Sequence, residues 1–167
     1  PVEHFATPEL HALIADMEDT MQAMNGAGLA APQIGVGLRV VMFGIVANSR
    51  YPDAEPVPQT VLINPVIAER EGSIVWEEGC LSVVDYTAEV RRSARVLVKA
   101  WTPDQKEIEI EAEELLAVAV QHELDHLDGK LFVDYLSELK RSRIRRKLEK
   151  DKRNRPATVE GVRTPAL

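Results

Sequence analysis

Cysteine is scarce in this 167-residue sequence, and long apolar runs and internal repeats are missing from it. A single cysteine excludes an intramolecular disulfide framework and is typical of a reducing compartment. No apolar run approaches the roughly 20 residues that a transmembrane helix needs, and no secretion signal opens the sequence. We therefore expect a cytoplasmic protein without a membrane partner.

The length and composition fit one globular unit. The chain is long enough to bury a core, and its apolar content of 45% is ordinary for a folded protein. We expect a single domain over residues 1–153, ending in a helix at about 137–153. Residues 154–167 contain two prolines and little apolar content, which predicts a flexible tail.

Charge is divided unevenly along the chain. The segment Lys140–Arg155 holds ten of the twenty basic residues and two acidic ones, a net +8, which leaves −15 for the rest of a chain whose total is −7. A basic arm on an acidic body points to a polyanionic partner, such as nucleic acid or an anionic surface. A helix whose charges simply face water is the other ordinary interpretation.

Two of the four histidines lie in one short motif, Gln121-His122-Glu123-Leu124-Asp125-His126. Residues i and i+4 of a helix share a face, so both imidazoles can bind one metal ion. Glu123 can then take a proton from a metal-bound water, as in a metal-assisted hydrolase. An acidic and apolar run leads into the motif and Gly129 follows it, which are helix start and stop signals. The competing interpretation is a surface helix with solvent-facing histidines.

The remaining patterns predict an α+β protein. Thr7-Pro8-Glu9 starts a helix that apolar spacing extends to about Asn25. A small-residue segment follows over 26–35, and 51–59 contains three prolines and is expected to be a loop. Strands are expected over 38–46, 60–68, 73–76, 87–91, 95–101 and 106–112. This order predicts short strands, mixed or antiparallel, around a central metal-binding helix, with an N-terminal helix and a basic C-terminal helix capped by Ser137.

Two histidines leave a catalytic metal one protein ligand short. The candidates are carboxylates and the sole cysteine, Cys80, which lies beside Gly79 in segment 77–82, an expected ligand loop between two expected strands. A lone cysteine is more often a small buried apolar residue, but glycine and acidic neighbours are poor core material. Cysteine with two histidines would leave the fourth position open to water, and would suit Zn²⁺ or Fe²⁺ rather than Mg²⁺ or Ca²⁺.

Three segments together resemble the signature motifs of the peptide deformylases. They occur in the family's order and with similar separations, and the similarity extends from the first helix through the basic helix. The resemblance implies an enzyme that removes the N-formyl group from the N-terminal formyl-methionine of nascent polypeptides and releases formate. The segments are Gly26-Ala27-Gly28-Leu29-Ala30-Ala31-Pro32-Gln33, Glu78-Gly79-Cys80-Leu81-Ser82 and Gln121-His122-Glu123-Leu124-Asp125-His126.

The resemblance also implies the metal chemistry of the site. Cys80, His122 and His126 would hold one divalent ion, which is ferrous iron in the family and is often exchanged for zinc, nickel or cobalt in preparations. Glu123 would act as general base on the water and then as general acid toward the departing amine.

Further residues would support the substrate and the ligands. Gln33 and the backbone N–H of Leu81 would stabilise the oxyanion that forms at the formyl carbon. The backbone of Gly28 would pair with an extended peptide. Glu78 would pair with Arg92 behind the ligand segment and orient it, whereas the plainer interpretation is two separate exposed charges.

One helix face next to the metal motif is apolar. Leu115, Val118 and Ala119 precede His122 by seven, four and three residues and share its face. We expect them to form a pocket wall suited to a methionine side chain, although ordinary core packing explains the same pattern.

The chain departs from the family pattern at two places. After Ser82 the family usually shows an aliphatic residue, then proline and often glycine, whereas this chain has Val83-Val84-Asp85-Tyr86. That stretch normally borders the substrate cleft, so a different peptide preference is expected. Family members also usually carry a further N-terminal segment with a strand, whereas this chain opens at Pro1, and we expect an exposed sheet edge.

The basic segment predicts a partner, and two other functions would also explain parts of the sequence. Lys140–Arg155 resembles the arm with which some bacterial deformylases dock on the ribosome, so a ribosomal contact is expected and specific DNA binding is not. A metallopeptidase with two histidines and a glutamate would instead cleave internal peptide bonds and usually uses an oxygen or histidine third ligand. A non-catalytic RNA- or ribosome-binding protein could keep the metal for folding alone, but would not need Glu123 or Gln33.

Overall fold

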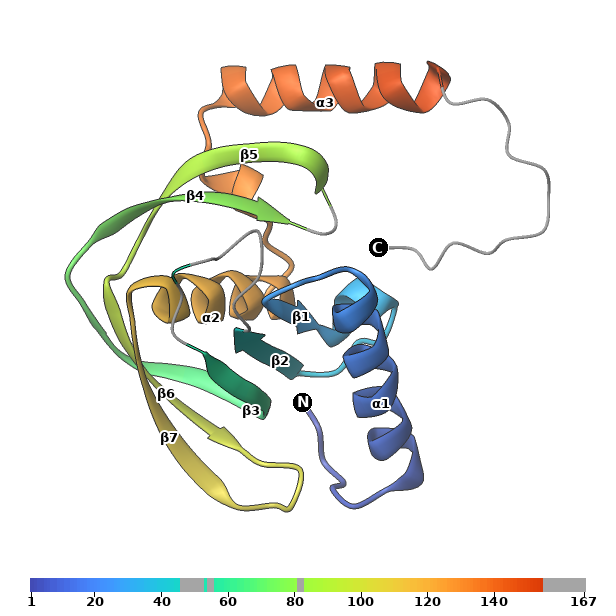
Figure 1. Cartoon of the computed structure of the whole chain (residues 1–167), viewed down its shortest axis with the longest axis vertical. Coiled ribbons are helices and arrows are strands. Elements are labelled where there is room, and N and C mark those ends of the chain that lie inside the picture. The colour runs from blue at the N-terminus through green and yellow to red at the C-terminus, as the bar shows by residue number, and fades with distance from the viewer. Residues whose placement is uncertain (46–52, 54–55, 81–82, 155–167) are drawn as a thin grey trace.

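The computed structural model describes residues 1–45, 53, 56–80 and 83–154, with the backbone alone for residues 84 and 85. It confirms the predicted α+β class, with two antiparallel sheets, three α-helices and two short 3₁₀ helices, labelled η (Figure 1). The elements are α1 (Pro8–Ala23), β1 (Gly28–Ala30), η1 (Ala31–Ile34), β2 (Val40–Ile45), β3 (Val57–Glu71), β4 (Ile74–Cys80), β5 (Val83–Arg92), β6 (Arg95–Trp101), β7 (Glu107–Glu113), α2 (Glu114–Leu127), η2 (Phe132–Tyr135) and α3 (Glu138–Asn154).

The larger sheet packs against a helix on each face. Its strand order is β1-β2-β3-β6-β7, and each pairing is antiparallel. Alternate residues of β2 point to opposite faces. Val40 and Met42 pack in the cluster that contains Met17 of α1, whereas Val41 and Phe43 pack in the cluster of α2. All six residues of β2 are therefore buried, as its continuous apolar sequence predicts.

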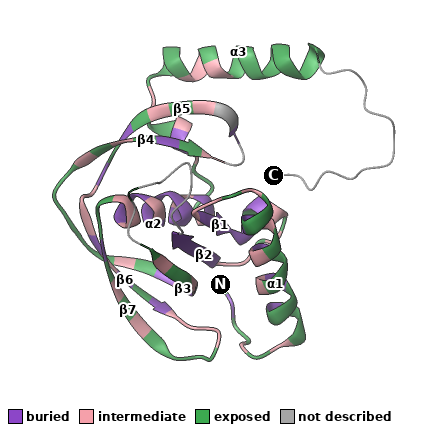
Figure 2. Cartoon of the chain, in the orientation of Figure 1, coloured by how far each residue is buried: buried purple, intermediate pink, exposed green. Residues whose placement is uncertain are grey.

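The smaller sheet consists of β4 and β5 and lies between α2 and α3 (Figure 1). Its apolar cluster contains Val83, Val90 and Phe132, and Ile144 of α3 packs against it. None of the residues of α3, all of which the structure describes, is buried (Figure 2). The basic helix is thus held to the body by a narrow contact and presents its charges to solvent.

The predicted helix boundaries have the expected capping contacts. Thr7 Oγ1 accepts a hydrogen bond from the N–H of Leu10 at 3.2 Å, which satisfies one free N–H at the start of α1. Gly129 has a φ of +73°, which ends the metal-motif helix in a left-handed conformation. The hydroxyl of Ser137 accepts from the N–H of Lys140 at 3.4 Å at the start of α3.

Two expectations about loops are wrong. Residues 57–59 belong to β3 rather than to a loop, because Pro58 lies next to the first residue of that strand, where a missing N–H is tolerated. Cys80 is the last residue of β4 rather than part of a loop, and residues 83–86 continue directly into β5. The segment of Cys80 and residues 83–86 thus lie on paired strands, with a register shift between Gly79 and Cys80. That residues 83–86 border the substrate cleft stays a prediction.

Three further expectations concern residues outside the described parts of the chain or are not tested by the fold. The backbone N–H of Leu81 and the tail from residue 155 lie outside the described residues. The division into one domain over residues 1–153 stays a prediction.

Among the described helices, none combines the length and the apolar character that crossing a bilayer requires.

Candidate metal centre

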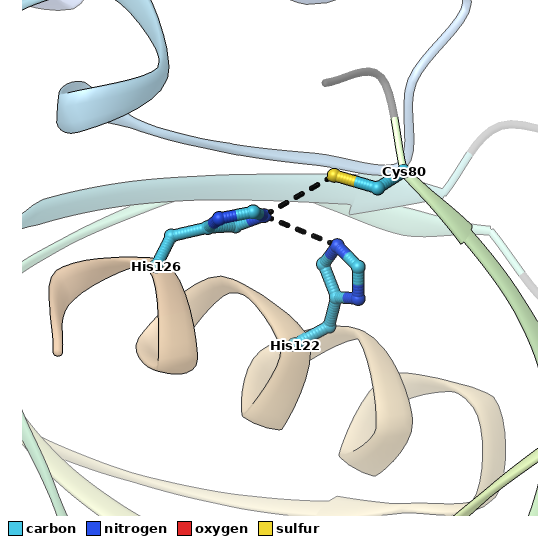
Figure 3. Close-up of side chains that lie close together, drawn as sticks. All are labelled: Cys80, His122 and His126. Carbon is cyan, nitrogen blue, oxygen red and sulfur yellow. Dashed lines mark hydrogen bonds between the residues drawn. The ribbon is translucent and has the colours of Figure 1, made fainter. Parts of the chain in front are cut away.

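Three side chains that are far apart in the sequence meet at one point. Cys80 comes from the end of β4, and His122 and His126 come from successive turns of α2 (Figure 3). Cys80 Sγ lies 3.4 Å from His126 Nε2, which lies 3.2 Å from His122 Nε2. One donor atom from each residue lies within 4.8 Å of the other two. The structure therefore brings together the three predicted ligands.

The distances between these donors fit a shared metal ion. A tetrahedral site with metal–sulfur bonds of about 2.3 Å and metal–nitrogen bonds of about 2.05 Å separates sulfur from nitrogen by roughly 3.5 Å and the two nitrogens by roughly 3.3 Å. The observed sulfur–nitrogen distance of 3.4 Å and nitrogen–nitrogen distance of 3.2 Å are close to both values. Donors of this softness suit zinc or ferrous iron.

A buried carboxylate sets the orientation of one ligand. Glu78 Oε1 lies 2.8 Å from His122 Nδ1, and Arg92 donates two hydrogen bonds of 2.8 Å to the same carboxylate. The pKa of Glu78, which burial would raise, is held below its ordinary value by Arg92 and His122. A carboxylate can only accept, so His122 donates through Nδ1, and its Nε2 is the nitrogen that faces His126 and could bind a metal once its proton is lost. The predicted pairing of Glu78 with Arg92 is present.

The ligands hold charge even without a cation. Burial would raise the pKa of Cys80, but hydrogen bonds and charge from His122 and His126 lower it to about 5. Burial would lower the pKa of His122, but Cys80 and Glu78 raise it to about 10. A thiolate thus lies beside a protonated imidazole. A metal ion would replace the imidazole proton, so metal binding should release protons.

Glu123 is the most unusual carboxylate of the site. It is buried, and its Oε2 has no hydrogen-bond partner among the described residues. Burial raises its pKa to about 7, although His122 and His126 oppose that change. Buried carboxylate oxygens rarely stay unpaired, so the geometry fits an acceptor that awaits a water or a substrate.

Gln33 and Gly28 complete the wall opposite α2. Gln33 Oε1 accepts a hydrogen bond from the N–H of Ala30 at 2.9 Å, which fixes the amide, and its Nε2 lies 3.7 Å from Cys80 Sγ. The amide N–H groups of Gln33 thus point toward the ligand cluster. A Cβ on Gly28 would lie 2.8 Å from Cγ and Oε1 of Glu123, so only glycine leaves room for that side chain.

A pocket opens beside the ligands, between β1, β4 and α2. Leu115, Val118 and Ala119 of the apolar face of α2 line it. Trp76 also lines it and was missed by the sequence analysis. Alternation along the strand would have found it, because Trp76 lies two residues before Glu78 and four before Cys80, on the same face of β4. The other lining residues are Gly26, Ala27, Gly28, Gln33, Glu77, Glu78, Gly79, Cys80, His122 and Glu123.

Comparisons with known proteins identify the family. A family model described as polypeptide deformylase matches residues 1–142. The chain belongs to the polypeptide deformylase family. A peptide deformylase of Alkalilimnicola ehrlichii is 49% identical over 154 residues, covering 92% of this chain and 83% of that protein.

Solved deformylase structures share the fold. The crystal structure of a peptide deformylase from Legionella pneumophila superposes with a TM-score of 0.80 at 47% identity, covering 93% of this chain and 89% of that one. A Met-Ala-Ser-bound class I type b peptide deformylase from Acinetobacter baumannii gives 0.78 at 38% identity, covering 81% of this chain and 86% of that one. These matches confirm the predicted deformylase-type metallohydrolase over the peptidase and non-catalytic alternatives.

The contact of Gly28 with Glu123 yields a direct prediction. Gly28→Ala should push the Glu123 side chain away from its position, and a shift of about 1 Å can cost roughly a hundredfold in rate. We expect kcat/KM for deformylation to fall by about that factor while the far-ultraviolet circular dichroism is retained. Gly37→Ala is the matched control, because a Cβ there meets no atom within 4 Å. An unchanged rate for Gly28→Ala would contradict the proposed fit.

Proposed function

We propose that the chain removes the formyl group from formyl-methionine at the start of nascent polypeptides and releases formate. The observation that carries this proposal is the buried oxygen of Glu123, which has no hydrogen-bond partner in the described part of the chain and lies beside a sulfur and two nitrogen donors. The pocket next to it suits an N-terminal methionine. A related deformylase has been solved with Met-Ala-Ser bound, which supports a methionyl peptide as the bound species.

We infer that Cys80, His122 and His126 hold one divalent ion, with ferrous iron as the native metal. When bound, such an ion would supply Lewis acidity and lower the pKa of a coordinated water toward neutrality. Glu78 would keep His122 in the donating tautomer throughout.

The protein side of the reaction requires one proton carrier and one anion stabiliser. Glu123 would take a proton from the attacking water and pass it to the amine that leaves, which is general base and then general acid catalysis. A cation beside it would favour its ionised form before reaction. The fixed amide of Gln33 would donate to the oxygen of the formyl group as negative charge develops there, with the N–H of Leu81 as the second donor.

Substrate binding would use an edge strand and an apolar wall. β1 lies at the end of the strand order, and Gly26, Ala27 and Gly28 line the pocket, so a peptide in extended form can pair with this segment. The methionine side chain would lie against Leu115, Val118 and Ala119 of α2. Trp76 would close the pocket from β4 and offer its ring to the thioether sulfur, a favourable contact.

Glu123 provides the test of the reaction itself. Glu123→Gln keeps the shape of the side chain but cannot carry the proton, so formate release from a formyl-Met tripeptide should fall by about 100-fold or more. Metal content, measured by elemental analysis, should stay the same, because Glu123 is not among the ligands. Formate release by the variant at the wild-type rate would rule out the assigned base.

We also propose that the basic helix α3 binds the ribosome electrostatically. The support is its composition and exposure: Arg143, Arg145, Arg146 and Arg153 are all exposed on one helix of an otherwise acidic chain. Its few contacts with the body, such as that of Ile144, leave this surface accessible. Binding of this kind falls steeply with salt.

Charge reversal on α3 tests the ribosome contact. Changing Arg143, Arg145, Arg146 and Arg153 to glutamate should abolish co-sedimentation with ribosomes at low salt and leave hydrolysis of a formyl-Met tripeptide unchanged. The same four positions changed to lysine form the control, because the charge is kept. Undiminished co-sedimentation of the glutamate variant would overturn the proposal.

A further inference from the structure

Tyr135 is half-exposed at the end of η2, yet its hydroxyl is engaged. It donates a hydrogen bond of 2.7 Å to Asp125 Oδ2, and its ring lies 4.6 Å below the guanidinium of Arg92. Asp125 belongs to the metal-motif helix and directly precedes the ligand His126. Neither Tyr135 nor Asp125 has a role predicted from the sequence.

From Asp125 a continuous path of hydrogen bonds reaches a metal ligand. Arg92 Nη1 donates to Asp125 Oδ2 at 2.5 Å, and Arg92 donates to both oxygens of Glu78. Glu78 in turn accepts from His122 at 2.8 Å. Arg92 thus bridges two carboxylates, one bound to the His122 ring and the other to the Tyr135 hydroxyl.

The same short helix also touches His122 directly. Phe132, the first residue of η2, is 1% exposed, and its ring stacks on the His122 imidazole with centroids 6.3 Å apart. The short helix η2 therefore contacts His122 through Phe132 at its start. At its end, Tyr135 contacts Asp125, the outermost carboxylate of the hydrogen-bond path. Such a turn is placed to fix both the plane of the ring and the direction of its lone pair.

The geometry of Arg92 explains why the outer end of the path matters. Its planar guanidinium presents N–H donors in a fixed fork, so the position of one carboxylate constrains the other. The Tyr135 hydroxyl holds Asp125 in place. Without that bond, Asp125 gains freedom to rotate, and the fork can tilt relative to Glu78.

We propose that Tyr135 and Asp125 are positioning residues that act through Arg92 and Glu78 to lock the orientation of His122 and slow the loss of the metal ion. The inference rests on the proposed metal site, and it adds Tyr135 and Asp125 as residues that hold Arg92 and Glu78 in place behind the ligand His122. Residues that orient metal ligands typically change metal affinity by about 10- to 100-fold when removed. Because Tyr135 lies three hydrogen bonds beyond Glu78, the residue that contacts His122, we expect an effect near the lower end.

The test compares two tyrosine-to-phenylalanine variants loaded with Co²⁺. Tyr135→Phe keeps the ring over Arg92 and removes only the hydroxyl, and it leaves no buried cavity because Tyr135 is 48% exposed. Tyr86→Phe is the matched control, since the Tyr86 hydroxyl donates to Asp151 of α3 at 3.2 Å, and that carboxylate is not on the path. Metal loss to excess chelator is followed through the visible absorption of Co²⁺.

We expect Tyr135→Phe to lose Co²⁺ about tenfold faster than the wild type and to show a shifted visible spectrum, with Tyr86→Phe within twofold of the wild type. The effect on deformylation should appear in kcat rather than in KM. Equal rates of metal loss for Tyr135→Phe and the wild type, or an equal acceleration in Tyr86→Phe, would overturn the inference.

Two further results separate this inference from the proposed function. A wild-type chain that binds no Co²⁺ would refute the metal site itself, whereas normal binding with an unaffected Tyr135→Phe refutes only the positioning role. If Tyr135→Phe fails to fold, Asp125→Asn provides the second variant, because it keeps an acceptor for Tyr135 but weakens the hold on Arg92. It too should lose Co²⁺ faster, and an unchanged rate would overturn the inference.

Discussion

The buried ion pair between Glu78 and Arg92 is the interaction on which the rest of the site depends. Their side chains are 4% and 3% exposed, and they join β4 to the last residue of β5. Removing one partner of such a pair typically costs about 3–5 kcal/mol, because the other charge is left buried and unpaired. Here the pair has a second role, because the Glu78 carboxylate also holds His122. The hairpin that supplies the cysteine ligand is thereby tied to the helix that supplies both histidines.

The buried charges explain why the centre requires a cation. Cys80, Glu78 and Glu123 are acidic groups close to one another, and of these three the salt bridges of Arg92 reach only Glu78. Burial raises the pKa of Glu123 to about 7, and Cys80 and Glu78 raise that of His122 to about 10 against the effect of its burial, so the cluster holds protons in the absence of a cation. A divalent ion would replace those protons and leave Glu123 free to accept one.

Sequence patterns predicted features set by neighbouring residues, such as helix faces and buried strands. They did not predict contacts between residues far apart in the sequence. The i, i+4 spacing of His122 and His126 fixes their shared helix face, and continuous apolar sequence marks β2 as a buried strand. Cys80 was assigned through resemblance, because no local rule joins it to His126, 46 positions away. Its expected loop was a strand, since Glu78 is buried by Arg92 of β5 and His122 of α2, and only the family resemblance pointed to the first of these partners.

The outer parts of the site depend on tertiary contacts in the same way. Asp125 was visible inside the motif, but its partner Arg92 lies 33 positions earlier and Tyr135 lies on a separate turn. Trp76 lies on the ligand face of β4 by simple alternation, yet only the packing of α2 against that strand makes this face a pocket wall. Local periodicity thus predicts which way a side chain points, and packing decides what it meets.

X-ray absorption spectroscopy of the metal-loaded chain tests the central claim most directly. A centre built from Cys80, His122 and His126 predicts one sulfur neighbour at about 2.3 Å and two nitrogen neighbours at about 2.0–2.1 Å, with one further light atom. A spectrum with these neighbours would support the assigned ligand set. A metal shell of nitrogen and oxygen alone, without sulfur, would contradict it.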